Sequence, residues 1–596
     1  MAAAMACLFS QSAFAFRLYT VGGDADCSFP DIQSAINNAI DADGNSVLVA
    51  RSGTYSNQHL VITGQNINIL GGLDNCSSSD YSGQTTINGT SGHSVIEIEG
   101  NSNVYLANLF ITGGNLDADH SGGGIYFGGQ GSLALANSMV SLNTAGYGGG
   151  INVNGSSGPT TLTLYSDTLI LNNTAQTSGG GIRVEGDTRL YVLQPNTLIA
   201  YNDALGGYGG GIEVLGPARA DIGSPGYGAL GVIFFNNAQY GGGIAAVTNS
   251  DQSNAVVRLF TTDGANPVQV ANNDASVKGG GIYLKSYIQF FPFELADAMA
   301  CASNYRINDN VAPDGAAIYA DRDQDISGVY AGSTINLNQS DPCGPEPAEA
   351  LGAVPCAQGV ACSEMARNVA AQSDATPTDG ATILVDNTGV LYAEKLVLRN
   401  NSGGRAIRLI GETNPDSFSQ PGGSLSNCLL VDNELTAELI RDEAFHQEPL
   451  TIDACAFANN AIGTQAVMHN EDALSMTNAL IYQPGKLTLE YSGSRQVTGR
   501  YVLASDVSTL PGDVTIQTLD DPRFADAASG NYHLQTTSPA VDYAGGVGGF
   551  DLEGNPRDVD LPQAPNAFGP RDLGPYERQL ACAGADTIFC DGFEAP

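Results

Sequence analysis

The sequence predicts an all-β chain folded as a parallel β-helix solenoid, with a short capping helix at its N-terminal end and a small C-terminal module. Three observations lead to this prediction. A glycine-run motif recurs along the chain, the segments between its copies alternate apolar and polar residues, and the composition is rich in Gly, Val, Ile, Thr and Asn but poor in Lys. Such a composition favours strands and tight turns over long helices.

The motif is a run of glycines that is followed by Ile and preceded by asparagine. The series opens at SGGGIYF (121–127) and continues through LNTAGYGGGI (142–151), NNTAQTSGGGI (172–182), YNDALGGYGGGI (201–212), NNAQYGGGI (236–244) and NNDASVKGGGI (272–282), with weaker copies NDNVAPDGAAI (308–318) and RNNSGGRAI (399–407). The Ile residues of the six strongest copies lie 26 to 38 residues apart. A period of this size indicates a solenoid.

Segments such as TTLTLYSDTLIL (160–171) alternate in the manner of strands. Three short strands per coil, each paired with its equivalent in the next coil, give a parallel β-helix. Gly at the corners permits a positive φ and close backbone approach. Asn tolerates the left-handed region, and its amide can hydrogen-bond from coil to coil. A phosphate-binding loop would need a single Gly run before a helix, followed by Lys and Ser or Thr, and the sequence does not fit that pattern.

The repeats of residues 90–480, roughly, resemble the GGA(I/L/V) and FxxN repeats of chlamydial polymorphic outer membrane proteins. More broadly they resemble right-handed parallel β-helix proteins of the pectate-lyase-like superfamily. The resemblance implies a right-handed solenoid over residues 61–510 and says nothing specific about activity. A Cys-rich loop insertion is expected at about 297–380.

The N-terminal end predicts an export signal followed by a cap. Residues 1–15 form a short apolar segment that ends in a small-x-small triplet, as Sec-type signal peptides do. Residues 16–60 are expected to form the cap and first coil. There Pro30 and Asp31 begin a short helix with Ile32, Ala35, Ile36 and Ala39 on one face.

The C-terminal end resembles the module of bacterial proteins called choice-of-anchor Q, over residues 511–580. The matching segments are DPRF (521–524), SPA (538–540), GNPR (554–557) and DLG (572–574). The resemblance implies a secreted or surface-attached protein. Residues 581–596 look like a short C-terminal tail of exported Gram-negative proteins, so the expected location is extracellular or the outer cell surface of such a bacterium.

The net charge limits the kinds of partner that can be expected, and the cysteines predict disulfide bonds. A net charge of −39 argues against nucleic acid as a partner, and no stretch of the mature chain is apolar enough to predict a membrane helix. Ten cysteines remain after Cys7, an even number that predicts disulfides in an exported chain. The expected local pairs are Cys27 with Cys76, Cys428 with Cys455, and Cys582 with Cys590, whereas the pairing among Cys301, Cys343, Cys356 and Cys362 is left open. No Cys-x-x-Cys pair or neighbouring His predicts a metal site, and no cofactor is expected.

The residue that follows each Gly-run Ile should point outward, and stacking should align these residues in one row: Tyr126, Asn152, Arg183, Glu213, Ala245, Tyr283, Tyr319 and Arg408. Tyr126, Arg183, Glu213, Tyr283 and Tyr319 are the candidate binding residues, because exposed tyrosines with mixed charge can bind sugar rings. The alternative is a solvated sheet face with a structural Arg183–Glu213 pair. No catalytic residues are predicted. The expected function is therefore an adhesin-like scaffold that binds a glycan or a surface protein; the alternative is a polysaccharide lyase or glycoside hydrolase whose site the sequence does not reveal.

Overall fold

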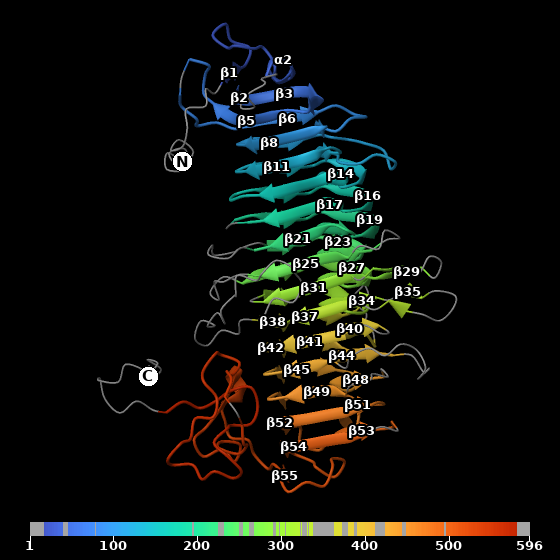
Figure 1. The fold of residues 1–596 in the computed structure, drawn as a ribbon, viewed down its shortest axis with the longest axis vertical. Coiled ribbons are helices and arrows are strands. Elements are labelled where there is room, and N and C mark those ends of the chain that lie inside the picture. Colours follow the sequence, from blue (N-terminus) through green and yellow to red (C-terminus); the bar gives the residue numbers. More distant parts are fainter. Residues whose placement is uncertain are drawn as a thin grey trace, which may run out of the picture.

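The computed structural model describes residues 17–39, 46–77, 79–193, 196–223, 232–248, 254–260, 267–289, 294–296, 298–303, 305–321, 323–324, 330–331, 333–337, 363–371, 379–386, 390–411, 423–443, 449–493, 496–546 and 548–580. These residues form a right-handed parallel β-helix, as the repeat predicts. Figure 1 shows the stack of coils running from the N-terminal cap (blue) to the last coils (orange), with the C-terminal module (red) beside the last coils. The predicted export signal and the tail lie outside the described residues.

Each coil contributes strands to three long faces, which we call face 1, face 2 and face 3 in chain order. Face 1 follows the Gly runs and consists of β4 (Leu60–Thr63), β7 (Ile96–Glu99), β10 (Ile125–Phe127), the first part of β14 (Ile151–Leu164) and of β17 (Ile182–Val192), β20 (Ile212–Leu215), β24 (Ile244–Val247), β28 (Ile282–Lys285), β34 (Ile318–Asp321), β40 (Ala381–Asp386), β44 (Arg405–Ile410), β48 (Ile440–Asp442), β51 (Ala466–Asn470) and β53 (Leu487–Tyr491).

Face 2 consists of β1 (Arg17–Val21), β2 (Ser46–Arg51), β5 (Asn66–Leu73), β8 (Asn101–Ala107), β11 (Gln130–Ala136), the second part of β14 and of β17, β21 (Arg219–Ile222), β25 (Ala255–Phe260), β31 (Ala298–Ser303), β37 (Thr334–Leu337), β41 (Val390–Glu394), β45 (Ser424–Ser426), β49 (Leu450–Asp453) and the first part of β52 (Leu474–Tyr482) and of β54 (Val497–Ala504).

Face 3 consists of β3 (Gly53–Gln58), β6 (Thr85–Gly89), β9 (Leu109–Thr112), β12 (Met139–Ser141), β15 (Leu169–Leu171), β18 (Leu198–Ala200), β22 (Val232–Phe234), β26 (Val268–Ala271), β32 (Tyr305–Asn308), β38 (Ser363–Ala366), β42 (Leu396–Arg399), β46 (Leu429–Val431), β50 (Ala456–Ala458), the second part of β52 and of β54, and β55 (Ile516–Thr518).

A short fourth strand in many coils was not predicted. It lies between the asparagines and the Gly run and forms a nine-stranded corner sheet of β13 (Thr144–Tyr147), β16 (Thr174–Ser178), β19 (Asp203–Tyr208), β23 (Asn237–Tyr240), β27 (Asp274–Lys278), β33 (Val311–Ala312), β39 (Val369–Ala370), β43 (Ser402–Gly403) and β47 (Glu434–Leu435). Two further hairpins project from the solenoid, β29 (Tyr287–Gln289) with β30 (Glu294–Ala296) and β35 (Asp323–Gln324) with β36 (Tyr330–Ala331).

The two asparagines of the motif have different structural roles. The first residue of each pair adopts the left-handed region, as Asn172 does with φ 53°. The second residue is buried and belongs to an asparagine ladder. Asn173 donates from its backbone N–H and from Nδ2 to Oδ1 of Asn202, both at 3.0 Å, and the pattern repeats through the stack. The ladder consists of Asn143, Asn173, Asn202, Asn236, Asn273, Asn310, Asn368, Asn401, Asn433 and Asn460.

The glycines of each run also differ in their task. Gly179 has φ +68°, and a Cβ there would lie 2.7 Å from Cβ of Arg183. The third glycine, Gly181, needs its missing side chain for a different reason, because a Cβ would lie 2.6 Å from the carbonyl oxygen of Gly211 in the next coil. The first glycine of the run is therefore needed for its backbone conformation, and the third is needed for close packing between coils.

The two ends of the solenoid are closed in different ways. Helix α2 (Ile32–Asn38) begins at Asp31, whose carboxylate accepts from the Ser34 N–H at 2.8 Å, and buries Ile32, Ala35 and Ile36 as predicted. At the other end the module contains β56 (Phe524–Asp526), the 3-10 helix η1 (Ala527–Ser529) and β57 (Asn531–Leu534). Its apolar residues pack on the outer side of the last strands of face 3.

Two predicted boundaries change. Strands β31, β32, β33, β34, β37, β38 and β39 fall within 297–380 and continue the stack, so strands of two successive coils lie in the predicted insertion. The weaker motif copy at 308–318 lies in this region, but it lacks a full glycine run, and the segment was therefore predicted as an insertion. The last strand, β55, still pairs with β54, so the stack also continues past residue 510.

The disulfide bonds in the structure agree with the predicted pairs only in part. Cys27 and Cys76 form the predicted disulfide, and Cys301 is disulfide-bonded as well. The predicted Cys428–Cys455 bond is not formed, and both side chains are buried free thiols. Their strands are stacked in register, and each thiol donates to a backbone carbonyl of its own coil, Ser426 at 3.2 Å and Asp453 at 3.3 Å. Cys343, Cys356, Cys362, Cys582 and Cys590 lie outside the described residues.

Candidate functional site

The predicted outward row exists on face 1. Parallel pairing in register aligns Glu97, Tyr126, Asn152, Arg183, Glu213, Ala245, Tyr283, Tyr319, Leu384, Arg408, Arg441, His469 and Glu490. The alignment expected for the eight predicted positions is confirmed. The row also continues beyond Arg408 into coils that have no glycine run.

The prediction that Tyr283 and Tyr319 are exposed is wrong. They are only 1% and 3% exposed. Tyrosines of the corner sheet pack against them, with the Tyr240 ring centroid 5.1 Å from that of Tyr283. The Tyr319 hydroxyl donates to Asp386 at 3.1 Å, and the Tyr283 hydroxyl donates to Asp321. These two tyrosines therefore have structural roles, because a neighbouring sheet that the sequence did not reveal covers them.

The Arg183–Glu213 pair is confirmed and buried. Nε of Arg183 lies 2.9 Å from the Glu213 carboxylate, and Nη2 lies 2.9 Å from that of Glu185. Burial raises the pKa of Glu213 to about 7, although the charge of Arg183 opposes the rise. Next in the row, Asn152 is fully buried with no hydrogen-bond partner for its amide atoms. Tyr126, at the N-terminal side, is half-buried.

The accessible part of the row lies toward the C-terminal end, where charged side chains gather. We call Arg405, Arg408, Glu438, Arg441, Glu443, His469, Glu471 and Glu490 the charged cluster. Arg441 is its centre. The guanidinium lies 2.6 Å from Glu443, 3.3 Å from Glu438 and 3.6 Å from Glu471. Glu471 and Glu490 are 34% and 61% exposed in their side chains, so the cluster meets solvent.

The electrostatics of the charged cluster favour the ionised forms of Glu438 and Glu443. Burial alone would raise the pKa of Glu443, but hydrogen bonds and positive charge from Arg441 and Arg408 outweigh it and lower the pKa below its ordinary value. Glu438 behaves in the same way between Arg405 and Arg441. Nε of Arg408 lies 3.0 Å from Glu443, which completes the network. Glu438 and Glu443 thus serve as fixed hydrogen-bond acceptors for the arginines of the cluster.

Of this cluster, only Arg408 belongs to the outward row that the sequence predicts. The signal for the rest was the register itself: once Ile407 is placed as an inward residue, Ile440 and Met468 take the same place in the next coils. The residues after them, Arg441 and His469, then point outward. Without a glycine run before Ile440 or Met468, that register could not be assigned from sequence.

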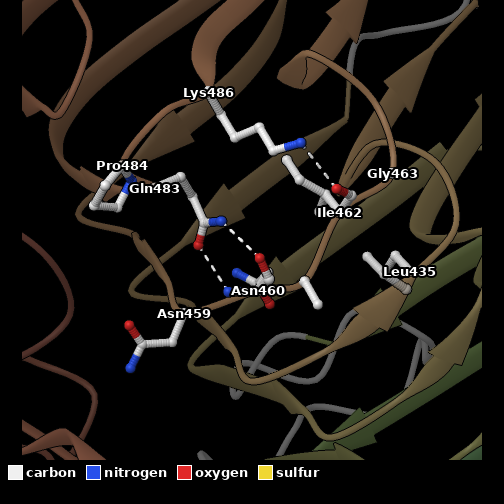
Figure 2. A pocket seen from close by; sticks show the side chains of 9 residues that line it. Leu435, Asn459, Asn460, Ile462, Gly463, Gln483, Pro484 and Lys486 are labelled. Atoms are coloured by element: carbon white, nitrogen blue, oxygen red, sulfur yellow. Dashed lines mark hydrogen bonds between the residues drawn. The ribbon is translucent and has the colours of Figure 1, made fainter.

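Two surface cavities lie near the end of the solenoid. The first, of about 420 Å³, is lined by Leu435, Asn459, Asn460, Ala461, Ile462, Gly463, Gln483, Pro484 and Lys486. Figure 2 shows that Gln483 ends the asparagine ladder there: its Oε1 accepts from Asn460 N–H at 2.7 Å, and its Nε2 donates to the Asn460 carbonyl at 2.7 Å. Nζ of Lys486 donates to the Ile462 carbonyl at 3.0 Å and to that of Thr464 at 2.6 Å. The two side chains thus stand where the next strand of the corner sheet would lie.

The second cavity, of about 490 Å³, lies between the solenoid and the C-terminal module. Its lining residues are Asn459, Tyr482, Asp521, Pro522, Arg523, Phe524, Ala527, Gln535 and Thr537. The predicted DPRF segment lines it, but its polar groups are used internally. Arg523 N–H donates to Asp521 at 2.8 Å, and its guanidinium donates to the Thr537 carbonyl at 2.6 Å. These hydrogen bonds stabilise the turn of the module.

Within the described residues, no group of three or more His, Cys, Asp or Glu side chains is placed to hold a metal ion. Nor does this part of the chain contain a helix long and apolar enough to cross a membrane. No protein-family model matches the chain, and no curated protein matches it either.

Proposed function

We propose that the protein is a secreted or cell-surface β-helix scaffold of a Gram-negative bacterium that binds an extracellular glycan or a surface protein without catalysing a reaction. The observation that supports this proposal best is the charged cluster. It combines rigidly held arginines and carboxylates, opens to solvent on the outward row, and lies on stacked strands that fix its geometry. Rigid elements hold binding groups more accurately than loops do.

The electrostatics favour binding over acid–base catalysis. A general acid or base works best with a pKa near the operating pH and within reach of the substrate. Glu438 and Glu443 have lowered pKa values, so they are poor proton donors. The pKa of Glu213 is about 7, but the residue is 4% exposed and paired with Arg183. None of these three carboxylates therefore combines a raised pKa with access to solvent.

Polyhydroxylated ligands suit the charged cluster chemically. Sugar hydroxyls both donate and accept, and they can bridge the guanidinium of Arg441 and the carboxylates of Glu443 and Glu471. The exported location is supported by the Cys27–Cys76 disulfide, because such bonds persist in oxidising compartments. The resemblance of the repeats and of the C-terminal segments to bacterial surface proteins supports the same location.

The test combines a binding screen with a turnover assay. The full chain is screened on an array of acidic and neutral glycans, and reducing ends and unsaturated uronates are measured with the same glycans. We expect binding without turnover, weakened at least tenfold by Arg441→Ala. Arg367→Ala is the matched control, because Arg367 pairs with Asp309 at 2.7 Å on another part of the surface. Turnover abolished by a single carboxylate substitution would support the alternative, a polysaccharide lyase or glycoside hydrolase.

A further inference from the structure

The charged cluster changes in character along the solenoid axis. Its arginines lie in the earlier coils, on β44 and β48, and they are followed in the outward row by His469 on β51 and Glu490 on β53. The two most exposed carboxylates of the cluster, Glu471 and Glu490, lie at this later end. We call His469, Glu471, Glu490 and the neighbouring Ser492 the acidic end of the cluster.

Carboxylates outnumber guanidinium groups in and around the cluster. The ion pairs are Arg405 with Asp379 and Glu438, Arg408 with Glu443, and Arg441 with Glu438, Glu443 and Glu471. Glu490 is a further acid to which none of these arginines is paired. Among the described residues, the imidazole of His469 is the one basic group that lies within 4 Å of the Glu490 carboxylate. The acidic end therefore carries negative charge that the arginines do not balance.

His469 lies between the two exposed carboxylates. Its Nε2 lies 3.2 Å from Oε1 of Glu471, and its Nδ1 lies 3.6 Å from Oε2 of Glu490. A neutral imidazole carries one N–H group and one nitrogen with a lone pair. Either tautomer therefore leaves one carboxylate facing a nitrogen that has no hydrogen to donate. The acidic end thus lacks one hydrogen-bond donor between its two carboxylates.

We propose that the charged cluster binds a glycan with free amino groups, and that an ammonium group of this glycan lies at the acidic end between Glu471 and Glu490. This inference rests on the proposed function and adds the chemical class of the glycan. An ammonium group has three N–H donors, so it can donate to both carboxylates with either tautomer of His469. Charge-assisted hydrogen bonds of this kind are stronger than those between neutral groups.

The charge of the chain selects against an acidic glycan. A net charge of −39 attracts cations and repels anions. The arginines that could pair with a uronate are already held by glutamates of the chain, as Arg441 is by Glu443 at 2.6 Å. A uronate would have to displace such a carboxylate, whereas an ammonium group supplies the donor that the acidic end lacks.

The groups beside the acidic end select an amino sugar over a basic peptide. The exposed Ser492 hydroxyl lies 3.4 Å from Nε2 of His469, and the guanidinium of Arg441 lies 3.6 Å from Glu471. A sugar amine has a hydroxyl on the adjacent carbon, which can bond to one of these groups while the ammonium binds the carboxylates. A lysine side chain ends in an ammonium on an aliphatic stem and has no such hydroxyl.

Calorimetric titration of the full chain tests the class of ligand. The probes are the β-1,4-linked hexamers of glucosamine, N-acetylglucosamine and glucuronic acid, together with hexalysine. We expect the glucosamine hexamer to bind about tenfold more tightly than the N-acetylglucosamine hexamer, because one hydrogen bond to a charged group contributes about that much. Its affinity should fall as the ionic strength rises. The glucuronic acid hexamer and hexalysine should bind more weakly.

Glu471→Gln and Glu490→Gln test the place of binding. Each substitution removes one negative charge at nearly constant size, so each should weaken the glucosamine hexamer about tenfold and leave the N-acetylglucosamine hexamer unchanged. Glu99→Gln is the matched control, because Glu99 is an exposed glutamate on β7 of the same face, and this variant should bind like wild type. Attraction to the acidic surface as a whole would instead change all three variants alike.

His469→Lys tests the missing donor directly. The substitution supplies an ammonium group from within the chain, so it should abolish the preference for the glucosamine hexamer. A wild-type chain without that preference, or a double variant Glu471→Gln and Glu490→Gln that keeps it, would overturn the inference. Hexalysine that binds as tightly as the glucosamine hexamer would also overturn it, in favour of a basic protein.

Failure of the inference and failure of the proposed function give different results. Binding of the N-acetylglucosamine or glucuronic acid hexamer that Arg441→Ala weakens, without preference for glucosamine, would reject the amino sugar and keep the glycan-binding scaffold. Absence of binding to every glycan and to hexalysine would reject both.

Discussion

Asn173 and Asn202 lie in adjacent coils, and two N–H groups of Asn173, one backbone and one side-chain, donate to the same Oδ1 of Asn202 at 3.0 Å. Nδ2 of Asn202 in turn donates to the Ile170 carbonyl at 2.9 Å and to Oδ1 of Asn236 at 3.0 Å. A buried amide that uses all its hydrogen-bonding capacity across three coils fixes the register of the stack. The motif therefore needs its second Asn because this residue belongs to the ladder. The exposed asparagine beside it has a different role.

Replacing a ladder residue should destabilise the solenoid strongly. Asn202→Ala leaves buried donors and an acceptor without partners, and each such group costs about 1–3 kcal/mol. We expect a loss of at least 3 kcal/mol and a lower thermal unfolding midpoint, with amide exchange accelerated in the adjacent coils. Asn172→Gly is the control. It keeps the left-handed corner and should change stability by only a few tenths of a kcal/mol. Equal effects of the two substitutions would contradict the assigned roles.

Two glycines of similar backbone conformation separate conformational cost from packing cost. Gly179 and Gly64 have φ +68° and +65°, but only at Gly179 would a Cβ meet other atoms. Gly64→Ala should cost about 1–2 kcal/mol for the left-handed backbone alone. Gly179→Ala should cost roughly 1–3 kcal/mol more, because the Cβ is overpacked against Arg183. Chemical denaturation of both variants measures the difference, and equal losses would show that the corner needs glycine only for its φ.

The buried Glu213 predicts a pH dependence with a defined sign. Its pKa is about 7 in the folded chain, above the ordinary value of 4.5. Between these two pH values, the folded state still holds a proton on Glu213 that the unfolded state has released. The contribution of Glu213 to stability therefore falls as the pH rises from about 4.5 to 7. The full change is on the order of 3 kcal/mol. Thermal unfolding at pH 5 and pH 8 should show a smaller difference for Glu213→Gln than for wild type.

Glu443 should give the opposite sign in the same measurement. Its pKa is lowered because hydrogen bonds and charge from its arginine partners outweigh burial. The stability that Glu443 contributes is therefore present above its ordinary pKa and is lost as the pH falls through the lowered value. Glu443→Gln should reduce the loss of stability on acidification. A variant that instead matched Glu213→Gln would contradict the assignment of Glu443 as an ionised partner of Arg441.

The end of the corner sheet predicts an effect on self-association. Lys486 satisfies the carbonyls of Ile462 and Thr464 at the edge where the next strand is missing. Lys486→Met removes these donors and a charge, so the exposed edge can pair with another chain. We expect faster aggregation on mild heating, measured by light scattering. Lys285→Met is the control, because it makes the same replacement on face 1, and this variant should aggregate like wild type.

The repeat made the fold predictable because each coil obeys the same local rules. Gly179 and Asn172 occur where the backbone must turn, and the alternation after Ile182 tells inward from outward positions. The same rules gave the Arg183–Glu213 pair, since register alone makes equivalent residues neighbours. Where the motif weakened, at 297–380 and beyond Arg408, the register could not be counted. The coil there and the charged cluster were missed for that reason.

The amino-acid pattern is enough to predict the solenoid, its capping helix and the alignment of the outward row. Which outward residues meet solvent depends on how the sheets and the module pack against one another. Tyr283 and Tyr319 look exposed in a single coil, yet the corner sheet covers them, whereas Tyr201 and Phe235 are 52% and 46% exposed. Alternation along a strand reports which side of its own sheet a residue faces. Burial depends on what a second sheet or a distant module places over that side, which no local pattern contains.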